Sequence, residues 1–357
     1  MKKIFIVFFL VLELQLMAQD PASSQFFFNP LYLNPAFAGF NKNARIGTDY
    51  RSQWTAIPSK FVTYNCWGDI YTPLFGFGFI AMKDVSGEGF LKTTSIGVIQ
   101  SYEILIPKVI RIRTGYNITI ANKRIDWNKL VFSDQLDGLQ GQVFSSSATP
   151  GNVEGKTFAD LTAGVILDLP KIKKIRKTTI TNTCGLTVNH LTEPNDGLSG
   201  SADAALPFKS TLHYTMVIEV LKDRMSKSSF FVSPNFVYEK QGRFTTTNVG
   251  FYVSKKPMIG GFFYRKRTIA DMKDDDSFIV FMGMHKAVNK EFGFRIGYSY
   301  DFTLNELAGN ALGSHEISIV AEFNNIKLFT KSENVRKRNK KIADCSDFGP
   351  SRDYKGF

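Results

Sequence analysis

The sequence predicts a transmembrane antiparallel β-barrel of about 14 strands. The first indication is the stretch at residues 291–302, where every second residue is large and apolar and the residues between are glycine, polar or charged. Such a strand suits lipid on one face and a wet lumen on the other. Composition is the second indication, because 14% of the residues are aromatic. Beyond the N-terminus there is also no apolar run of the roughly 18 residues that a membrane helix needs.

Fourteen segments carry the alternation or the β-branched and aromatic composition of strands. Most have about nine to twelve residues, which is enough for a tilted strand to cross a bilayer. The predicted strands are residues 45–51, 63–71, 75–84, 92–103, 109–121, 160–169, 178–187, 209–220, 229–239, 243–254, 258–267, 276–284, 291–301 and 313–323.

The connections between these strands give an independent indication. An even-stranded barrel has long external loops at one end and short periplasmic turns at the other. Counted from a periplasmic N-terminus, the longest connections, residues 122–159, 188–208 and 302–312, all fall on the external side. Most of the short connections fall on the opposite side, although residues 240–242 form one very short external turn.

We expect four regions along the chain. Residues 1–18 have the features of a secretory signal, since two lysines precede an apolar run. Residues 19–44 are rich in Asn-Pro and aromatic residues without strand alternation, and residues 45–323 form the barrel. Residues 324–357 are a basic tail, either a periplasmic docking arm or a solvated disordered end. Export together with amphipathic strands predicts a location in the bacterial outer membrane.

Several charged residues alternate with apolar ones in the predicted strands, so they should face the lumen if their neighbours face lipid. The candidate lumen charges are Arg111, Arg113, Arg265, Arg295, Glu316 and Glu322. We expect Glu316 and Glu322 to pair with Arg295 across the wall. Charges in a wet lumen of this kind are expected to support the barrel or a plug rather than to bind a substrate.

Two Asn-Pro pairs mark the region before the first strand. Each proline fixes its own φ and pushes the preceding asparagine towards an extended conformation. The resulting irregular backbone cannot face lipid, so it must lie in the lumen or in the periplasm. We expect residues 20–44 to fold into the barrel as a plug, with a periplasmic strap as the alternative. The candidate plug or partner contacts are Asn29, Pro30, Asn34, Pro35, Phe37, Arg51 and Trp54.

The net charge of +12 arises largely from basic residues in the predicted periplasmic turns and in the tail. Residues 171–177 are an example, with five lysine or arginine residues. A basic collar at this rim would attract the anionic head groups of the lipid bilayer. No basic helix or RNA-binding aromatic signature accompanies the charge, so we expect no nucleic-acid partner.

The sequence predicts no catalytic residues, no cofactor and no metal site. His190 lies near Glu193, but there is no second ligand at useful spacing. Residues 274–276 are three aspartates without the oxygen-ligand spacing of a calcium loop, so we interpret them as a solvated turn. A hydrolase would need a serine, a histidine and an acid in contact. Neither His190 nor His315 can be placed in such a group.

Six blocks of sequence carry a resemblance to a known family. The first combines QDP at residues 19–21, SQ at 24–25 and NPLYLNPAFAGF at 29–40, and the second is YRSQW at 50–54. The others are DWNKLVFSDQLDG at 126–138, GLTVNHLTEP at 185–194, GYSYDFTLNEL at 297–307 and GSHEI at 313–317. In this order they resemble the PorP/SprF-type outer-membrane proteins of Bacteroidota, which are associated with type IX secretion and gliding. The opening block and the last two are the most specific.

This resemblance implies a non-enzymatic barrel that aids the export or surface anchoring of a client protein bearing a C-terminal type IX sorting domain. Adhesin-like clients and periplasmic secretion or gliding components are the implied partners. We expect the client to meet the long loops at residues 122–159 and 188–208. An outer-membrane channel for small solutes is the alternative, because the NPAFAG motif also resembles the hatch of 14-stranded fatty-acid transporters.

Overall fold

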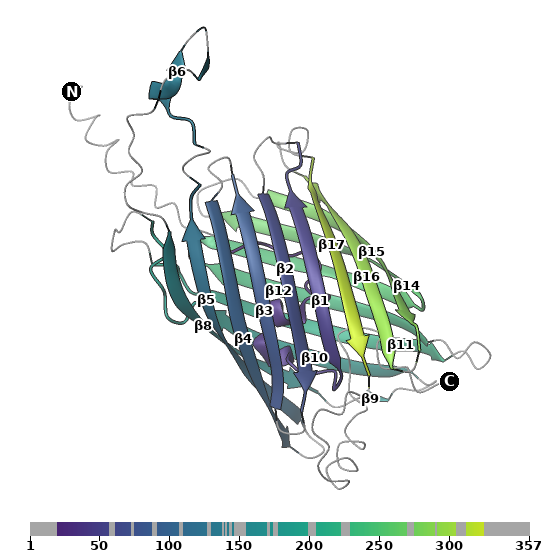
Figure 1. Ribbon diagram of the computed structural model, residues 1–357. Coiled ribbons are helices and arrows are strands. Elements are labelled where there is room, and N and C mark those ends of the chain that lie inside the picture. The colour runs from purple at the N-terminus through teal and green to yellow at the C-terminus, as the bar shows by residue number, and fades with distance from the viewer. Residues whose placement is uncertain are drawn as a thin grey trace, which may run out of the picture.

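A computed structural model gives the arrangement of the chain (Figure 1). It describes residues 20–324 except for 57–60, 73–74, 88–90, 107–109, 127–129, 138, 140, 143–144, 146–154, 170–171, 174–177, 199–204, 223–228, 270–274, 290 and 305–311. The predicted signal segment, most of the basic tail and most of the basic turn at residues 171–177 lie outside the described residues. Those three assignments therefore stay predictions.

Fourteen long strands occur in the described part of the chain, one for each predicted segment. They are β1 (Ala44–Gln53), β2 (Phe61–Tyr71), β3 (Phe75–Ser86), β4 (Leu91–Ile106), β5 (Ile110–Arg124), β8 (Lys156–Asp168), β10 (Thr179–Asn189), β11 (Lys209–Lys222), β12 (Ser229–Gln241), β13 (Phe244–Lys255), β14 (Met258–Ile269), β15 (Asp275–Ala287), β16 (Phe292–Thr303) and β17 (Ser314–Phe323). Several extend beyond the predicted ends, because a barrel wall continues its hydrogen-bond ladder past the lipid-facing residues.

Each long strand pairs antiparallel with its neighbours in the chain, and the first and last strands pair with each other. In the register of β1 with β17, Arg51 lies opposite Glu316. The pairing of β10 with β11 completes the ring. The sheet therefore has no free edge among these strands, and the predicted antiparallel β-barrel is confirmed (Figure 1).

The two faces of the wall differ as the alternation predicts. In β16, Ile296 and Phe302 are exposed on the outer surface, whereas Arg295 and Asp301 are buried on the lumen side. A strand has a side-chain period of two, so this pattern fixes which face meets lipid. The outer surface is apolar, as in other membrane barrels, whereas the lumen side of the wall carries buried charged and polar residues together with some apolar ones.

The remaining elements are short. The two-residue strands β6 (Leu136–Asp137) and β7 (Gly141–Gln142) pair with each other, next to the 3₁₀ turn η3 (Ser133–Gln135). They lie beyond one end of the barrel (Figure 1). Strand β9 (Ile172–Lys173) pairs with β10 at the opposite end. None of the described helices is both long and apolar enough to cross a membrane.

The two ends of the barrel are distinguished by their connections. Strands β1, β3, β5, β10 and β12 all finish at one end, which we call the outer end, and β1 begins at the other, the inner end. The connections that follow β5 and β10 lie at the outer end and are the two longest between successive long strands. Long loops are typical of the external side of such barrels, so we interpret the outer end as external.

Candidate functional site within the barrel lumen

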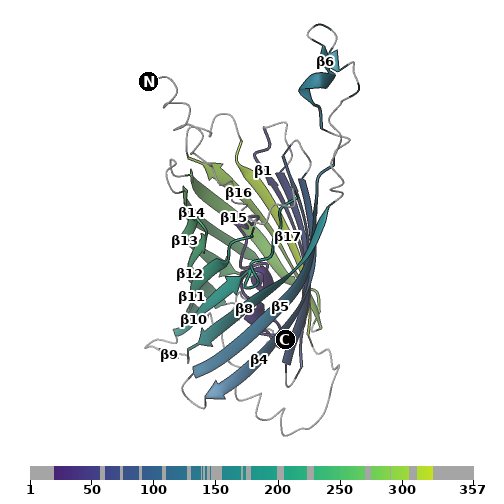
Figure 2. The ribbon, with the colours of Figure 1, turned by 90° about the vertical axis from the view of Figure 1, so that its left-hand side faces the viewer.

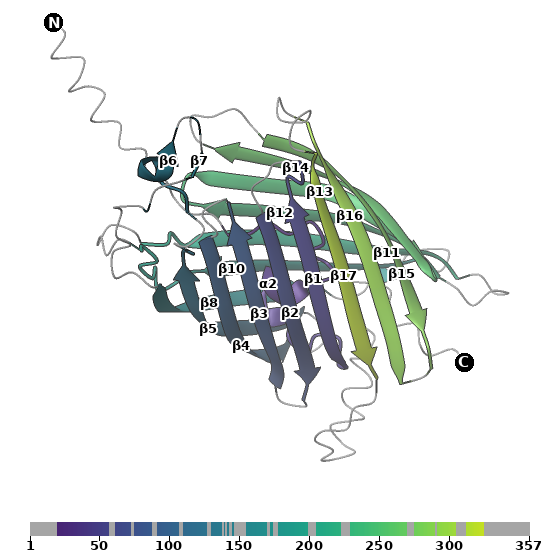
Figure 3. The same cartoon turned by 45° about the horizontal axis from the view of Figure 1, so that its top comes forward.

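Residues 20–43, which we call the N-terminal segment, lie inside the barrel and cross it from the outer end to the inner end. The backbone nitrogen of Asp20 donates to Gln241, the last residue of β12, over 3.1 Å at the outer end. The segment then runs into Ala44, where β1 begins at the inner end. Figures 2 and 3 show its helical turns enclosed by the strands.

Both Asn-Pro pairs start a short helical turn. The Asn29 side chain accepts a hydrogen bond from the Tyr32 nitrogen (3.2 Å) at the start of α2 (Pro30–Leu33). Asn34 does the same for the Ala36 nitrogen (2.9 Å) in η1 (Pro35–Phe37). Proline suits the first position of a helix, where its missing N–H is not needed. The sequence predicts an irregular backbone here, and the two caps provide hydrogen-bond acceptors for part of it.

The same asparagines also contact the wall. The Asn29 amide donates to the Asp49 carboxylate of β1 over 2.9 Å. The Asn34 amide faces the carbonyls of Val165 and Leu186 at 3.2 and 3.3 Å, and the ring of His213 at 3.1 Å. Each asparagine therefore caps a turn with its oxygen and fixes that turn to the barrel with its nitrogen.

The middle of the N-terminal segment fills the bore with aromatic rings. Phe27 lies within 6 Å of five rings, which include Tyr252, Phe263 and Phe281 of the wall. Phe26, Phe27, Phe28, Leu31, Leu33, Phe37 and Phe40 are all buried. Burial of a large side chain stabilises a fold by about 1.5–3 kcal/mol, so this layer is the main apolar contribution of the segment.

Several wall glycines lie where the segment comes too close for a side chain, and two of them face the η1 turn. A Cβ atom added at Gly115 would lie 2.5 Å from the nitrogen of Ala36. One added at Gly164 would lie 2.2 Å from the Asn34 side-chain oxygen. Both glycines face the η1 turn from neighbouring strands, so the turn packs directly against the backbone of the wall at these positions.

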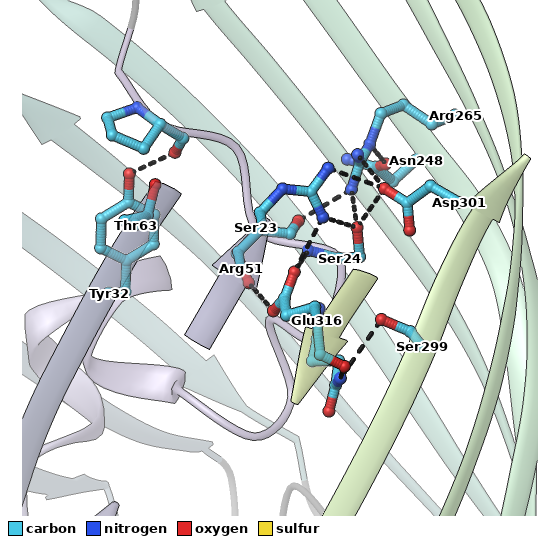
Figure 4. A network of polar contacts seen from close by, with 12 residues as sticks. Ser23, Ser24, Tyr32, Arg51, Thr63, Asn248, Arg265, Ser299, Asp301 and Glu316 are labelled. Carbon is cyan, nitrogen blue, oxygen red and sulfur yellow. Dashed lines mark hydrogen bonds and ion pairs between the residues drawn. The ribbon is translucent and has the colours of Figure 1, made fainter. Parts of the chain in front are cut away.

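A network of charges holds the outer part of the N-terminal segment (Figure 4). Arg51 of β1 donates to Asp301 of β16 at 2.8 Å and to Glu316 of β17 at 2.9 Å. The Ser24 hydroxyl accepts from Arg51 (2.7 Å) and donates to Asp301 (2.6 Å). The backbone nitrogens of Ser24 and Gln25 donate to Glu316 at 2.7 and 3.1 Å.

A second arginine completes this network. Arg265 of β14 donates to Asp301 at 3.1 Å, to the Ser24 hydroxyl at 2.9 Å and to the Ser23 carbonyl at 2.9 Å. Two arginines thus face two carboxylates in the wall, and the segment adds only neutral groups. Buried charges are tolerated when they are paired and hydrogen-bonded, which is the arrangement here.

Near the inner end, arginines of β5 hold the segment by its backbone. Arg113 donates to the carbonyls of Ala36 and Ala38 at 3.2 and 2.7 Å. Arg111 pairs with Asp168 of β8, and both guanidinium groups lie over the ring of Phe40 at 5.3 and 5.6 Å. These contacts satisfy backbone carbonyls that would otherwise be buried without a donor.

A separate cluster holds the first described residue at the outer end. The Asp20 carboxylate lies 3.0 Å from His190 Nε2 and 3.6 Å from the amine of Lys209. The other ring nitrogen of His190 lies 2.8 Å from Asp160. Burial alone would raise the pKa of the Asp20 carboxyl. Lys209 and His190 lower this pKa by more than burial raises it, so it lies well below its usual value. Burial lowers the pKa of His190, but both carboxylates raise it, to about 9 overall.

The predicted lumen charges have different outcomes. Arg295 pairs with Glu322 at 2.8 Å, as expected. The expected pair of Arg295 with Glu316 is wrong, because Glu316 binds Arg51 and the segment instead. Trp54 lies past the end of β1, where its ring packs on Phe61 at 5.0 Å and its backbone nitrogen donates to the Gly313 carbonyl at 2.8 Å.

Several residues of this candidate site were not predicted from the sequence. Asp20, Asp160, Lys209 and Asp301 were not among the candidates, although the last three share the parity of lumen-facing residues in their strands. That parity was the available signal. His190 was considered as a metal ligand from the sequence. The described residues contain no group of three or more histidine, cysteine or acidic side chains that could hold a metal ion.

The chain was compared with solved structures, with curated proteins and with family models. Among solved structures, a Pseudomonas aeruginosa FadL homologue matches with 13% identity and a TM-score of 0.42, covering 85% of this chain and 95% of that chain. The CymD monoaromatic hydrocarbon channel matches with 11% identity and a TM-score of 0.43, covering 84% and 92%. At these values the likenesses carry no conclusion about what this barrel binds. No curated protein matches the chain.

A family model described as the type IX secretion system membrane protein PorP/SprF matches residues 16–320. This match covers most of the chain, the fold is an antiparallel barrel with a lipid-suited skin, and the location is the bacterial outer membrane. The chain therefore belongs to the PorP/SprF family of type IX secretion system membrane proteins.

Proposed function

We propose that this protein is a closed, non-enzymatic barrel that helps to export or anchor a client protein bearing a C-terminal type IX sorting domain. One observation supports it most: the N-terminal segment occupies the bore from the outer end to the inner end. A filled bore suits a holding or assembly role better than the passage of solutes. The small-solute channel is therefore the less favoured function.

The surface proposed for the client is the outer end. The long connections that follow β5 and β10 both lie there, as does the β6–β7 pair beyond the rim. The second connection is itself braced, since Asn195 bridges to Ala205 and Lys123 of β5 pairs with Asp196 at 2.5 Å. A braced loop loses less conformational entropy when a partner binds.

A pull-down from outer membranes tests the proposal. A tagged chain should recover a secreted protein with a C-terminal type IX sorting domain. Replacing residues 130–142 with a glycine-serine stretch of equal length should reduce that recovery, because this removes the β6–β7 pair. The control replaces the short outer turn at Gly242 and Arg243 with Asn-Gly, which should have no effect. Recovery of barrel-assembly factors alone would contradict the proposal.

A further inference from the structure

A cavity of about 190 Å³ lies inside the outer half of the barrel, between the N-terminal segment and the wall of β3, β4, β5 and β8. Tyr32 and Pro21, which share a hydrogen bond of 2.6 Å, are among the segment residues that line it (Figure 4). It is separate from the Arg51 network, because none of Arg51, Asp301 and Glu316 lines it. The contacts described so far assign no role to this cavity.

The lining changes from apolar to acidic along one strand. Ile80, Met82 and Asp84 follow each other at alternate positions of β3, on the lumen face, with Asp84 nearest the outer end. Leu31 of the N-terminal segment lines the deeper part next to Ile80, since it packs on β3 near Gly78. A ligand that enters from the outer end would therefore place an apolar group deep and a polar group near the rim.

Four carboxylates line the cavity: Asp20, Asp84, Asp160 and Asp196. Three of them have cationic partners, because His190 lies between Asp20 and Asp160 and Lys123 pairs with Asp196. Asp84 differs. Its hydrogen bonds come from the hydroxyls of Thr63 (2.6 Å) and Ser86 (2.7 Å), and no cation within the described residues pairs with it.

A second polar atom in the lining can also accept a hydrogen bond. The side-chain oxygen of Asn117 is buried, and no donor among the described residues reaches it. A buried acceptor without a donor costs free energy, so such positions are places where a ligand or water supplies a hydrogen. The cavity therefore offers acceptors and one uncompensated negative charge beside apolar walls.

We propose that this cavity binds a group with an apolar end and a cationic head, namely an amine or guanidinium held at Asp84 with its apolar part between Leu31, Ile80 and Met82. Two sources share this chemistry: a client peptide with an apolar residue next to a lysine or arginine, and a free alkylamine. Only the peptide source rests on the proposed function. The site itself stands on the cavity.

Reaction rates of a cysteine inside the cavity test the charge preference. The three native cysteines are replaced by serine and Thr93→Cys is introduced, since Thr93 lines the cavity. Methanethiosulfonate reagents with an ammonium or a sulfonate group are then compared in detergent. The ammonium-to-sulfonate rate ratio should exceed that of Glu193→Cys, an exposed outer position, by about fivefold or more, because acidic clefts concentrate cations.

Asp84→Asn should remove most of this excess, whereas Glu193→Gln, which loses the same charge outside the cavity, should leave it unchanged. Heat-dependent gel migration shows that each variant is folded. A rate ratio at Thr93→Cys equal to that of the exposed position, or one that Asp84→Asn does not change in a folded barrel, would overturn the proposal.

Protection of the same cysteine identifies the source. Acetyl-Leu-Lys-amide should slow the modification, and acetyl-Leu-Gln-amide should not. Hexylamine is the free-amine probe. If hexylamine protects and the dipeptide does not, the site stands and the peptide source is overturned. Loss of client in the pull-down with dipeptide protection intact would instead contradict the proposed function and leave the site in place.

Discussion

Residues 20–25 contact the barrel through charge-assisted hydrogen bonds to Arg51, Asp301, Glu316 and His190, whereas residues 26–40 fill the bore mostly with apolar side chains. The polar contacts are directional, so they fix the position and register of the segment. The apolar contacts are not directional and supply most of the free energy. Position and affinity of the N-terminal segment are therefore encoded in different parts of it.

The largest expected effect comes from the apolar part. Phe27→Ala should lower the free energy of unfolding by about 3–5 kcal/mol, because a buried ring is lost and a cavity is left. Urea unfolding of the barrel refolded in lipid vesicles measures it. Phe278→Ala, at an exposed lipid-facing ring of β15, is the matched control and should cost much less. Equal losses would mean that the segment contributes little to stability.

In the polar part, Arg51→Ala should cost about 3 kcal/mol, because Asp301 and Glu316 would lose a buried partner. Arg51→Lys should recover only part of this, since a lysine cannot bridge two carboxylates with a planar fork. Arg243→Ala, an exposed turn residue, is the control, with an expected change below about 0.5 kcal/mol. The same urea titration applies, and an Arg51→Ala loss no larger than that of the control would show that this network does not stabilise the barrel.

A smaller loss of unfolding free energy is expected where the η1 turn packs on the glycines of the wall. Gly115→Ala should cost about 1–3 kcal/mol, because the added methyl group meets the backbone of Ala36. Gly260→Ala is the control, since its nearest neighbour would be 3.7 Å away. Protease cleavage of residues 20–43 should also become faster in Gly115→Ala alone. Equal cleavage rates in the two variants would show that the turn does not rest on this glycine.

The smallest effect depends on pH. His190 has a pKa raised to about 9, so its contribution to stability is complete below its ordinary value of 6.5 and is lost as the pH rises through 9. At pH 6, His190→Gln should cost about 1.5 kcal/mol, the value of a charge-assisted hydrogen bond. The difference from the parent chain should shrink by pH 10. A difference that stays constant between these pH values would contradict the raised pKa.

The strands could be predicted from the sequence because alternation is a local property. The parity of each strand also placed Arg111, Arg113, Arg265 and Arg295 on the lumen side, where all four are buried. The partners of these charges could not be predicted in the same way. Glu316 meets Arg51 because β17 closes on β1, and that register depends on the whole ring. The Asn-Pro pairs of the N-terminal segment indicated a stiff backbone. They did not indicate that the asparagine side chains cap two helical turns.

Ion conductance in planar bilayers tests the central claim, that the N-terminal segment closes the lumen. The intact chain is compared with a variant lacking residues 22–40, after heat-dependent gel migration has shown that both are folded. We expect no resolved conductance steps for the intact chain and clear steps for the shortened one, with a mean conductance about tenfold or more above that of the intact chain, because a barrel of this size then has a water-filled bore. Equal conductance of the two folded chains would contradict it.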